Sequence, residues 1–280
     1  MGQYVQNQND IMAVDRLCTR KPPYCPPMPA KLPPLQEPEL YPDRVAYAGW
    51  PFDLHNPKGM RDPAHPPFTS HKMPYMYSTP LRSLVSKDLT NLFFAGRLAS
   101  FSHVVYGSQR VMKTCATMGQ AAGTAASYSV THHVDPIALK DDPSAVWSIQ
   151  QQLLRDDAYI IGMYNADPRD YARRAQVTAT SEQPGSSAAN VLTGQTRAVV
   201  DPNDQITIGA GGGVPASQGI NGTNRWISSG LPATLTLALQ APVPIKQVHL
   251  VFDTGMHRKL AFSVVFNTNN PTSTWGPQPK

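Results

Sequence analysis

Apolar positions in the middle of the chain change from a continuous run to a helical spacing. Residues 92–94 form the apolar run, and Ala95-Gly96 follows it. A continuous apolar run is typical of a strand covered on both faces, as in a parallel or mixed sheet surrounded by helices. We therefore predict a buried strand over residues 91–97. Ligands of open α/β sheets bind at the carboxyl ends of such strands.

A helix lined with small residues is predicted next, with Ser108 placed to cap its first free amides. The positive end of a helix favours an anion or an electron-rich carbonyl, and Arg110 would add a full charge there. Each glycine inside a helix costs about 1 kcal/mol relative to alanine. The two glycines therefore predict close approach of a sheet or a cofactor, and a small-residue helix packed in a core is the alternative. Two adjacent stripes carry the small residues: Val111, Cys115, Met118 and Ala122, and Met112, Ala116, Gly119, Gly123 and Ala126.

A second amphipathic helix is predicted over residues 145–154, with Ser144 as its cap. The pair Asp156-Asp157 ends it. Its apolar positions fall on one face: Val146, Ile149, Leu153 and Leu154.

Strand signals dominate from about Arg173 onward, after a change of character near Asp167-Pro168. Leu235, Leu237 and Leu239 alternate with more polar positions, which indicates one buried face and one exposed face. We predict a β-sandwich with strands over residues 176–180, 234–239, 247–252 and 260–266. The predicted domains are therefore residues 1–166 and 167–280.

Composition limits the partners this chain can have. The 280 residues allow one large or two ordinary domains, and the net charge is +5. Basic residues are scattered without a stripe of interleaved aromatics, so we expect no nucleic-acid partner. Cys18, Cys25 and Cys115 form no C-x-x-C pair, which argues against a metal site. No segment is long and apolar enough to predict a membrane span, and the sequence indicates no compartment.

Proline is concentrated before residue 81, where more than half of the 28 prolines lie. The proline-rich segment 21–42 is incompatible with a helix or a central strand. It is predicted to be an extended crossing segment. A ligand for an SH3-like domain would have the same composition.

Several motifs in order carry a resemblance to a known family. They are residues 48–55, 77–84, 91–97 and 103–123. Together, residues 41–160 resemble the C-terminal part of the FAD-dependent oxidoreductase family, which is related in fold to the succinate dehydrogenase and fumarate reductase flavoproteins. Residues 189–194, 225–228 and 248–252 resemble a galactose-binding-like jelly roll of the discoidin type.

The resemblance implies FAD as cofactor and hydride transfer between a substrate C–H and flavin N5. The substrate would be a small molecule of unknown identity. Ala95, Gly96 and Arg97 would lie along the flavin and its ribityl chain. His103 would be a proton donor, and Arg110 would orient an anionic group. His55 and Arg82 are expected to line the same cavity. The pyrimidine end of the flavin would contact Gly107, Ser108, Arg110, Val111 and Met112.

Each of these side chains also has a plain structural interpretation. A single histidine in a loop is more often a surface or hydrogen-bonded structural residue. Asp53 could equally cap or pair locally.

One departure from the family pattern decides the predicted fold class. A flavoprotein of this kind holds the ADP pyrophosphate with a strand, a G-x-G-x-x-G turn and a helix. The glycine cluster at 209–213 lacks that spacing and is followed by Val214-Pro215. We therefore predict an α/β flavoprotein fragment, an incomplete FAD-binding fold without the N-terminal Rossmann half, joined to a truncated β-sandwich. Such a chain would bind FAD weakly or not at all and would be inactive alone.

Two other functions remain open. A carbohydrate-binding module on a non-catalytic scaffold would make carbohydrate the ligand, with Trp226 and Asn224 as sugar contacts. A packing role for Trp226 is the alternative there. A structural remnant without activity is the third interpretation.

Overall fold

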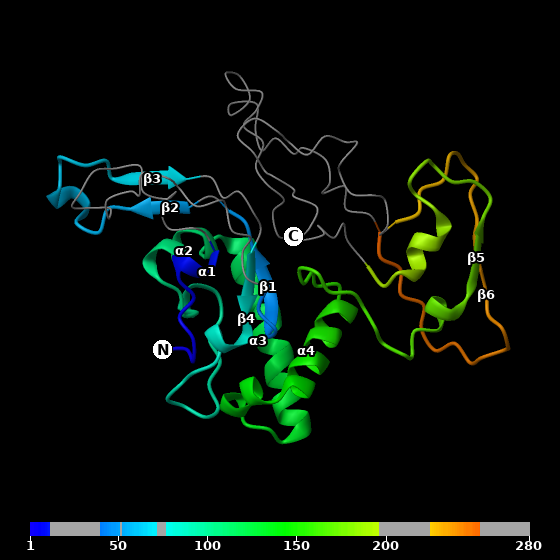
Figure 1. Cartoon of the computed structure of the whole chain (residues 1–280), viewed down its shortest axis with the longest axis horizontal. Coiled ribbons are helices and arrows are strands. Elements are labelled where there is room, and N and C mark those ends of the chain that lie inside the picture. The colour runs from blue at the N-terminus through cyan, green and yellow to red at the C-terminus, as the bar shows by residue number, and fades with distance from the viewer. Residues whose placement is uncertain (12–39, 51, 72–76, 196–224, 253–280) are drawn as a thin grey trace. The chain divides into compact units, whose positions relative to one another are not determined.

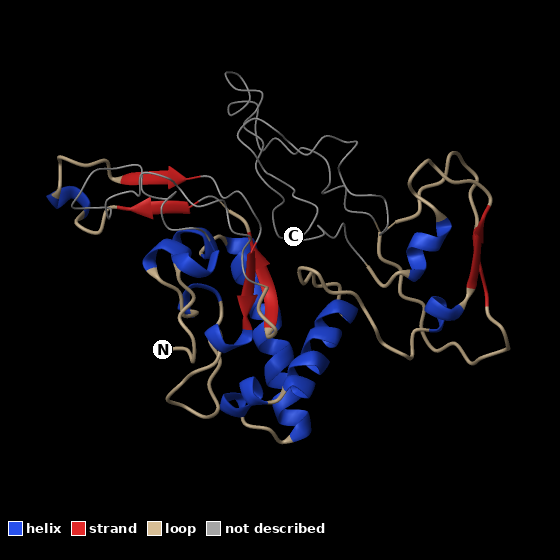
Figure 2. Ribbon diagram, in the orientation of Figure 1, coloured by secondary structure: helices blue, strands red, loops and turns tan. Residues whose placement is uncertain are grey.

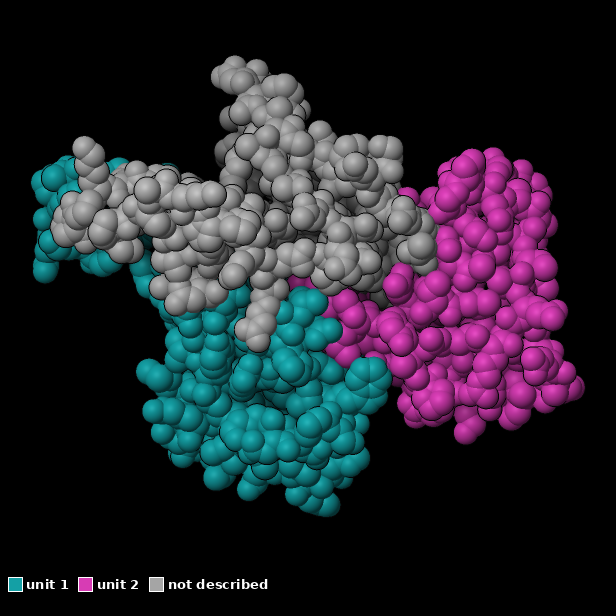
Figure 3. Space-filling model, in the orientation of Figure 1, with its two compact units in different colours: residues 1–150, 276–280 teal, residues 151–275 magenta. Residues whose placement is uncertain are grey.

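The computed structural model describes residues 1–11, 40–50, 52–71, 77–195 and 225–252. The chain divides into two compact units, and the division falls between Gln150 and Gln151 (Figure 3). Each unit is described by itself.

The first unit contains two small antiparallel sheets and several helices (Figures 1 and 2). Strand β1 (Arg44–Ala48) pairs with β4 (Tyr77–Pro80), and β2 (Phe52–His55) pairs with β3 (Phe68–His71). The chain is thus a mixed α/β protein, as predicted in general terms. The helices and 3-10 turns of this unit are α1 (Gln8–Ile11), η2 (Gly59–Arg61), η3 (Leu81–Ser83), η4 (Gly96–Leu98), α2 (His103–Gln109), α3 (Met112–His132), η5 (Pro136–Asp141) and α4 (Pro143–Arg155), which continues past Gln150.

The predicted buried strand over residues 91–97 is wrong. Phe93 makes only an isolated bridge to Val85, and residues 92–94 are half-buried. The amide of Ser86 donates to the Leu92 carbonyl at 3.0 Å, and the Phe94 amide donates to the Leu84 carbonyl at 2.6 Å. The apolar run therefore closes a tight reversal of the chain on residues 84–86. The backbone of an apolar run forms hydrogen bonds with a neighbouring segment. The sequence of the run does not specify which segment that is.

The core of the first unit lies around β1, β4, β2 and α2. Fully buried apolar side chains from five elements form it: Ile11, Ala48, Phe52, Tyr77 and Val105. Helix α3 packs along β1 with a buried face of Thr114, Met118, Ala121, Ala122, Ala125 and Ser129. Strand β2 packs against α2.

The second predicted stripe of α3 is on the open face. Gly119 and Gly123 are exposed, and a β-carbon at either position would contact nothing within 4 Å. The expectation that a close neighbour explains these glycines is therefore not met within the described part of the chain. The first stripe was partly right, because Met118 and Ala122 are buried.

Helix α4 forms where it was predicted, with a different cap. Asp142 Oδ1 accepts from the amides of Ser144 and Ala145 at 2.9 and 3.0 Å, so Asp142 takes the role assigned to Ser144. An aspartate preceding the first turn caps free amides as well as a serine does, and its charge also favours the helix start. The predicted apolar face is confirmed as buried: Val146, Ile149, Leu153 and Leu154.

The described part of the second unit contains one two-stranded sheet. Strand β5 (Gln176–Ala179) pairs antiparallel with β6 (Leu235–Ala238), which confirms the first two predicted strands. Residues 247–252 form no strand, and Val248 and Phe252 are exposed, so that prediction is wrong; no described neighbour pairs with them. Residues 260–266 lie outside the described residues. The 3-10 turns are η6 (Tyr171–Arg174) and η7 (Ala188–Leu192). A β-sandwich here stays a prediction.

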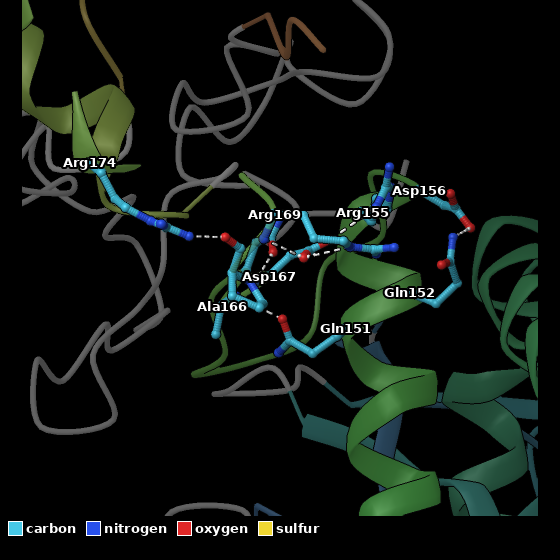
Figure 4. Close-up of polar contacts among 10 residues, drawn as sticks. Gln151, Gln152, Arg155, Asp156, Ala166, Asp167, Arg169 and Arg174 are labelled. Atoms are coloured by element: carbon cyan, nitrogen blue, oxygen red, sulfur yellow. Dashed lines mark hydrogen bonds and ion pairs between the residues drawn. The ribbon is translucent and has the colours of Figure 1, made fainter. Parts of the chain in front are cut away.

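Polar contacts centred on the Asp167 carboxylate connect α4 to the segment that follows it (Figure 4). Asp167 accepts from Arg155 Nη1 at 2.9 Å and from Arg169 Nη2 at 2.8 Å. Gln151 Oε1 accepts from the Ala166 amide at 2.7 Å. The hydrogen bond and charge of Arg169 lower the pKa of Asp167 to about 2.

Among the described helices, none is long and apolar enough to cross a membrane.

Candidate functional site

A break between two helices creates the electropositive end that the sequence suggested. Helix α2 ends at Gln109, and Val111 is extended with φ −69° and ψ 144°. Helix α3 then runs for 21 residues from Met112, and its first intrahelical bond joins the Cys115 amide to the Val111 carbonyl. In the described structure, no side chain caps this start and no acidic residue lies in its first turn. Uncapped amides at the start of a long helix carry positive partial charge.

The helix start is therefore not at Ser108, and that prediction is wrong. Ser102 caps α2, with its hydroxyl accepting from the Val105 amide at 3.4 Å. Ser108 is buried in the last turn of α2, where its hydroxyl donates to the Trp50 carbonyl at 2.6 Å. A serine after glycine matches the helix-start pattern, but here the hydroxyl satisfies a carbonyl at the end of a neighbouring strand.

Gly107 has a packing role that the sequence did not separate from a cofactor role. A β-carbon at Gly107 would lie 2.8 Å from Leu54 Cδ2 and 3.0 Å from the Asp53 carbonyl oxygen. Strand β2 can therefore approach α2 only because this position lacks a side chain. Gly107 and Ser108 are both buried by the chain itself.

The turn at η4 lies against the first turn of α3. Gly96 has φ +58°, and a β-carbon there would lie 3.3 Å from Cys115 Cβ. Arg97 Nε donates to the Arg110 carbonyl at 3.3 Å. Burial raises the pKa of the Cys115 thiol, although the Arg97 charge lowers it. The structure thus brings residues 95–97 beside residues 110–112, two groups that the resemblance had placed on the same flavin.

Arg110 is paired with a residue that the sequence left undecided. Its Nη2 donates to Asp53 Oδ2 at 2.9 Å and to the Asp53 carbonyl at 3.1 Å. His55 Nε2 lies 3.6 Å from the same carboxylate oxygen. Asp53, His55 and Arg110 therefore form one cluster, called the β2 cluster below. No motif signalled it, because Asp53 and Arg110 are 57 residues apart in the chain.

The two other predicted polar site residues lie elsewhere. Arg82 has its guanidinium carbon 4.8 Å from the ring centre of Tyr4 and 5.4 Å from that of Tyr41. Its Nε is 3.4 Å from Asp43 Oδ2. These contacts give Arg82 a structural role at the N-terminal segment. His103 is exposed in the first turn of α2, seven positions before Arg110.

A buried amide network fixes the end of α2. Gln109 Nε2 donates to Thr79 Oγ1 at 2.8 Å and to Gln6 Oε1 at 3.3 Å, and Gln6 Nε2 donates to the Ser78 carbonyl at 2.8 Å. Gln109 Oε1 and Thr114 Oγ1 are buried without a hydrogen-bond partner among the described residues. Sequence reasoning missed Gln109, because a buried glutamine has no local signature. The network holds the break between α2 and α3 in place.

Comparison with known proteins gives one match. A family model described as FAD dependent oxidoreductase matches residues 1–153 of the 280, which is more than half of the chain. No curated protein and no solved structure matches. In the described residues, no group of histidine, cysteine, aspartate and glutamate side chains could hold a metal ion. With the α3 start, the η4 turn and residues 48–55 all inside the matched range, the chain belongs to the FAD dependent oxidoreductase family, whose cofactor is FAD.

Proposed function

We propose that the first unit forms the flavin end of an FAD site in an oxidoreductase of small molecules. The observation that carries the proposal is the uncapped start of α3 beside the η4 turn. The pyrimidine edge of a flavin presents carbonyl oxygens, and it gains negative charge on reduction. Free amides at a helix start can donate hydrogen bonds to these carbonyl oxygens and can stabilise the added negative charge.

The residues present fit this cofactor. Met112, Lys113 and Thr114 contribute the first amides of α3, and Met112 and Lys113 are exposed. Gly96 presents backbone without a side chain next to them. The residues that would hold the flavin end are Ala95, Gly96, Arg97, Arg110, Val111 and Met112. Gly107 and Ser108 are left out, because Gly107 is packed against Leu54 and Asp53 and the buried Ser108 hydroxyl donates to the Trp50 carbonyl.

The chemistry divides between cofactor and chain. Bound FAD supplies the acceptor or donor of a hydride exchanged with a substrate C–H bond. The amides of α3 stabilise negative charge at the pyrimidine edge, in the way that preorganised donors stabilise developing charge. His103 and His55 are the candidates to hold or release the accompanying proton, since both imidazoles are accessible.

The ADP half of FAD requires a further element. No strand with a G-x-G-x-x-G turn exists in this sequence, so the chain offers no pyrophosphate cradle of that kind. We therefore propose that the chain is one part of a fold related to the succinate dehydrogenase and fumarate reductase flavoproteins, and that it binds FAD weakly by itself. Tight FAD binding and activity would then need an element that holds the pyrophosphate.

A sugar-binding role of the discoidin type in the second unit has less support. The indole of Trp226 is half-buried, and its Nε1 donates to the Ser181 carbonyl at 3.0 Å. That contact favours a packing role. Asn224 lies outside the described residues. Carbohydrate as a ligand stays a prediction, which a glycan array would test.

Replacing one amide donor tests the flavin proposal directly. Proline is tolerated in the first turn of a helix, and Val111 already has the extended backbone required before proline. Met112→Pro removes one free N–H without breaking α3, whereas Met112→Ala removes the side chain and keeps the amide. We expect Met112→Pro to weaken riboflavin and FAD binding about fivefold relative to Met112→Ala, since one hydrogen bond contributes about 1 kcal/mol.

Flavin-fluorescence titration measures the affinities, and amide chemical shifts of residues 112–114 report the location. Equal affinity of the two variants, or shifts confined to other residues, would contradict the proposal.

A further inference from the structure

The Asp53 carboxylate on strand β2 binds Arg110, which lies in the break between α2 and α3. Asp53 receives two hydrogen bonds from Arg110 Nη2, one on its side chain and one on its backbone carbonyl. The side chains of Arg110 and Asp53 are 29% and 39% exposed, so water only partly screens the pair. The tight contact of Gly107 with Leu54 and Asp53 fixes the two backbones against each other. The pair is therefore built into the packing of β2 on α2.

The position of the pair gives it an electrostatic consequence. Arg110 is the residue that follows the last residue of α2, and α3 begins two residues later. An unpaired guanidinium there would add a full positive charge to the positive end of a 21-residue helix. With Asp53 in place, the pair has no net charge. The remaining positive potential at the helix start comes from the fixed backbone amides and from the exposed side chains of Lys113 and Arg97 beside them.

We propose that Asp53 is a positioning residue of the flavin site, which holds Arg110 on β2 and compensates its charge. The inference rests on the proposed function. In this arrangement the Arg110–Asp53 pair adds no net charge to the potential felt by the flavin. Arg110 is withheld from the anion-orienting role that the resemblance gave it. His55, whose Nε2 lies 3.6 Å from the carboxylate, is the third member of the β2 cluster.

Chemical modification tests the pairing without any cofactor. Phenylglyoxal reacts with accessible guanidinium groups, and peptide mass spectrometry gives the rate for each arginine. We expect Asp53→Asn to make Arg110 react several-fold faster in the full chain, with exposed Arg97 as an internal reference. Asp62→Asn is the matched control, because Asp62 lies in the β2–β3 loop and pairs with His65 at 2.8 Å. Equal Arg110 rates in the wild type and Asp53→Asn overturn the proposal, and Asp53→Ser replaces Asp53→Asn if the latter does not fold.

The midpoint potential of bound FAD tests the charge compensation. Asp53→Asn leaves an extra positive charge and should shift the potential upward, whereas Arg110→Gln leaves Asp53 uncompensated and should shift it downward. The double variant and Arg110→Lys should both lie near the wild type. If Asp53 had only a structural role, the two single variants would not shift the midpoint potential in opposite directions, and the shifts would not cancel in the double variant.

The outcomes separate this inference from the function on which it rests. Identical potentials in all variants, or equal shifts in Asp53→Asn and Asp62→Asn, overturn the compensation by Asp53. Failure of the wild-type chain to take up FAD at any concentration overturns the proposed function, and with it the electrostatic part of this inference. The phenylglyoxal rates then still decide whether Asp53 holds Arg110.

Discussion

Asp167 is a carboxylate whose charged form is stabilised by its neighbours. Two arginines from different segments, Arg155 and Arg169, donate to it (Figure 4). Its side chain is 13% exposed, while that of Arg169 is 74% exposed, so only part of the interaction is shielded from solvent. The depressed pKa therefore reports a real but moderate stabilisation of the charged form.

The Asp167 carboxylate predicts a defined pH dependence of stability. A carboxyl whose folded pKa is about 2 stabilises the folded state fully above its unfolded pKa near 4. That contribution is lost as the pH falls through about 2. We expect Asp167→Asn to lower the free energy of unfolding by about 1 kcal/mol at pH 7. The difference from the wild type should narrow below about pH 4.

Urea unfolding at several pH values measures this difference. Asp141→Asn is the control, because Asp141 is an exposed carboxylate that pairs with Lys140 on the surface. A constant difference between Asp167→Asn and the wild type from pH 7 to pH 3 would show that the charge is not responsible.

At the scale of elements, the motif over residues 103–123 spans two helices, α2 and the first part of α3. The small-residue pattern from residue 103 to 123 reads as one segment, but the backbone is extended at Val111. The amide network of Gln109 and the Arg110–Asp53 pair hold the two helices on either side of that break. Local spacing fixed the buried face of α3, at Met118 and Ala122, because helical periodicity is a property of neighbouring residues. The position of the break could not be predicted, because residues far away in the sequence hold it.

Two glycines of these helices should respond to alanine in opposite ways. Gly119→Ala places a methyl group in open space on α3, so we expect about 1 kcal/mol of added stability from helix propensity. Gly107→Ala places it 2.8 Å from Leu54 Cδ2, so we expect about 1–3 kcal/mol of destabilisation from overpacking.

Thermal or urea unfolding of the two alanine variants gives both values. Destabilisation by Gly119→Ala would mean that another part of the protein or a ligand covers that face of α3.

At the scale of the whole molecule, the proposed site would hold one half of a two-part cofactor. The family match covers residues 1–153, and the segments proposed to contact the flavin lie inside it. The sequence holds no strand with a G-x-G-x-x-G turn for the other half. The chain should therefore distinguish the isoalloxazine part of FAD from its ADP part.

Ligand-induced stabilisation tests this distinction. A ligand that binds only the folded chain stabilises it by about 2.7 kcal/mol when present at 100 times its dissociation constant. We expect riboflavin and FAD to raise the melting temperature of the full chain, and ADP at the same concentration to leave it unchanged. Stabilisation by ADP equal to that by FAD would place the ligand at a different site from the one proposed.

The sequence by itself determined the family, the FAD cofactor, the buried face of α4, part of the buried face of α3 at Met118 and Ala122, and strands β5 and β6. These features depend on residues that are close together in the chain, so spacing and motif order reveal them. Only the tertiary structure decided that the buried Ser108 hydroxyl donates to the Trp50 carbonyl, that residues 92–94 close a turn, and that Asp53 binds Arg110. Each of these depends on a contact between segments that are distant in the chain. The free energy of such a contact depends on both segments, so the sequence of one segment does not predict it.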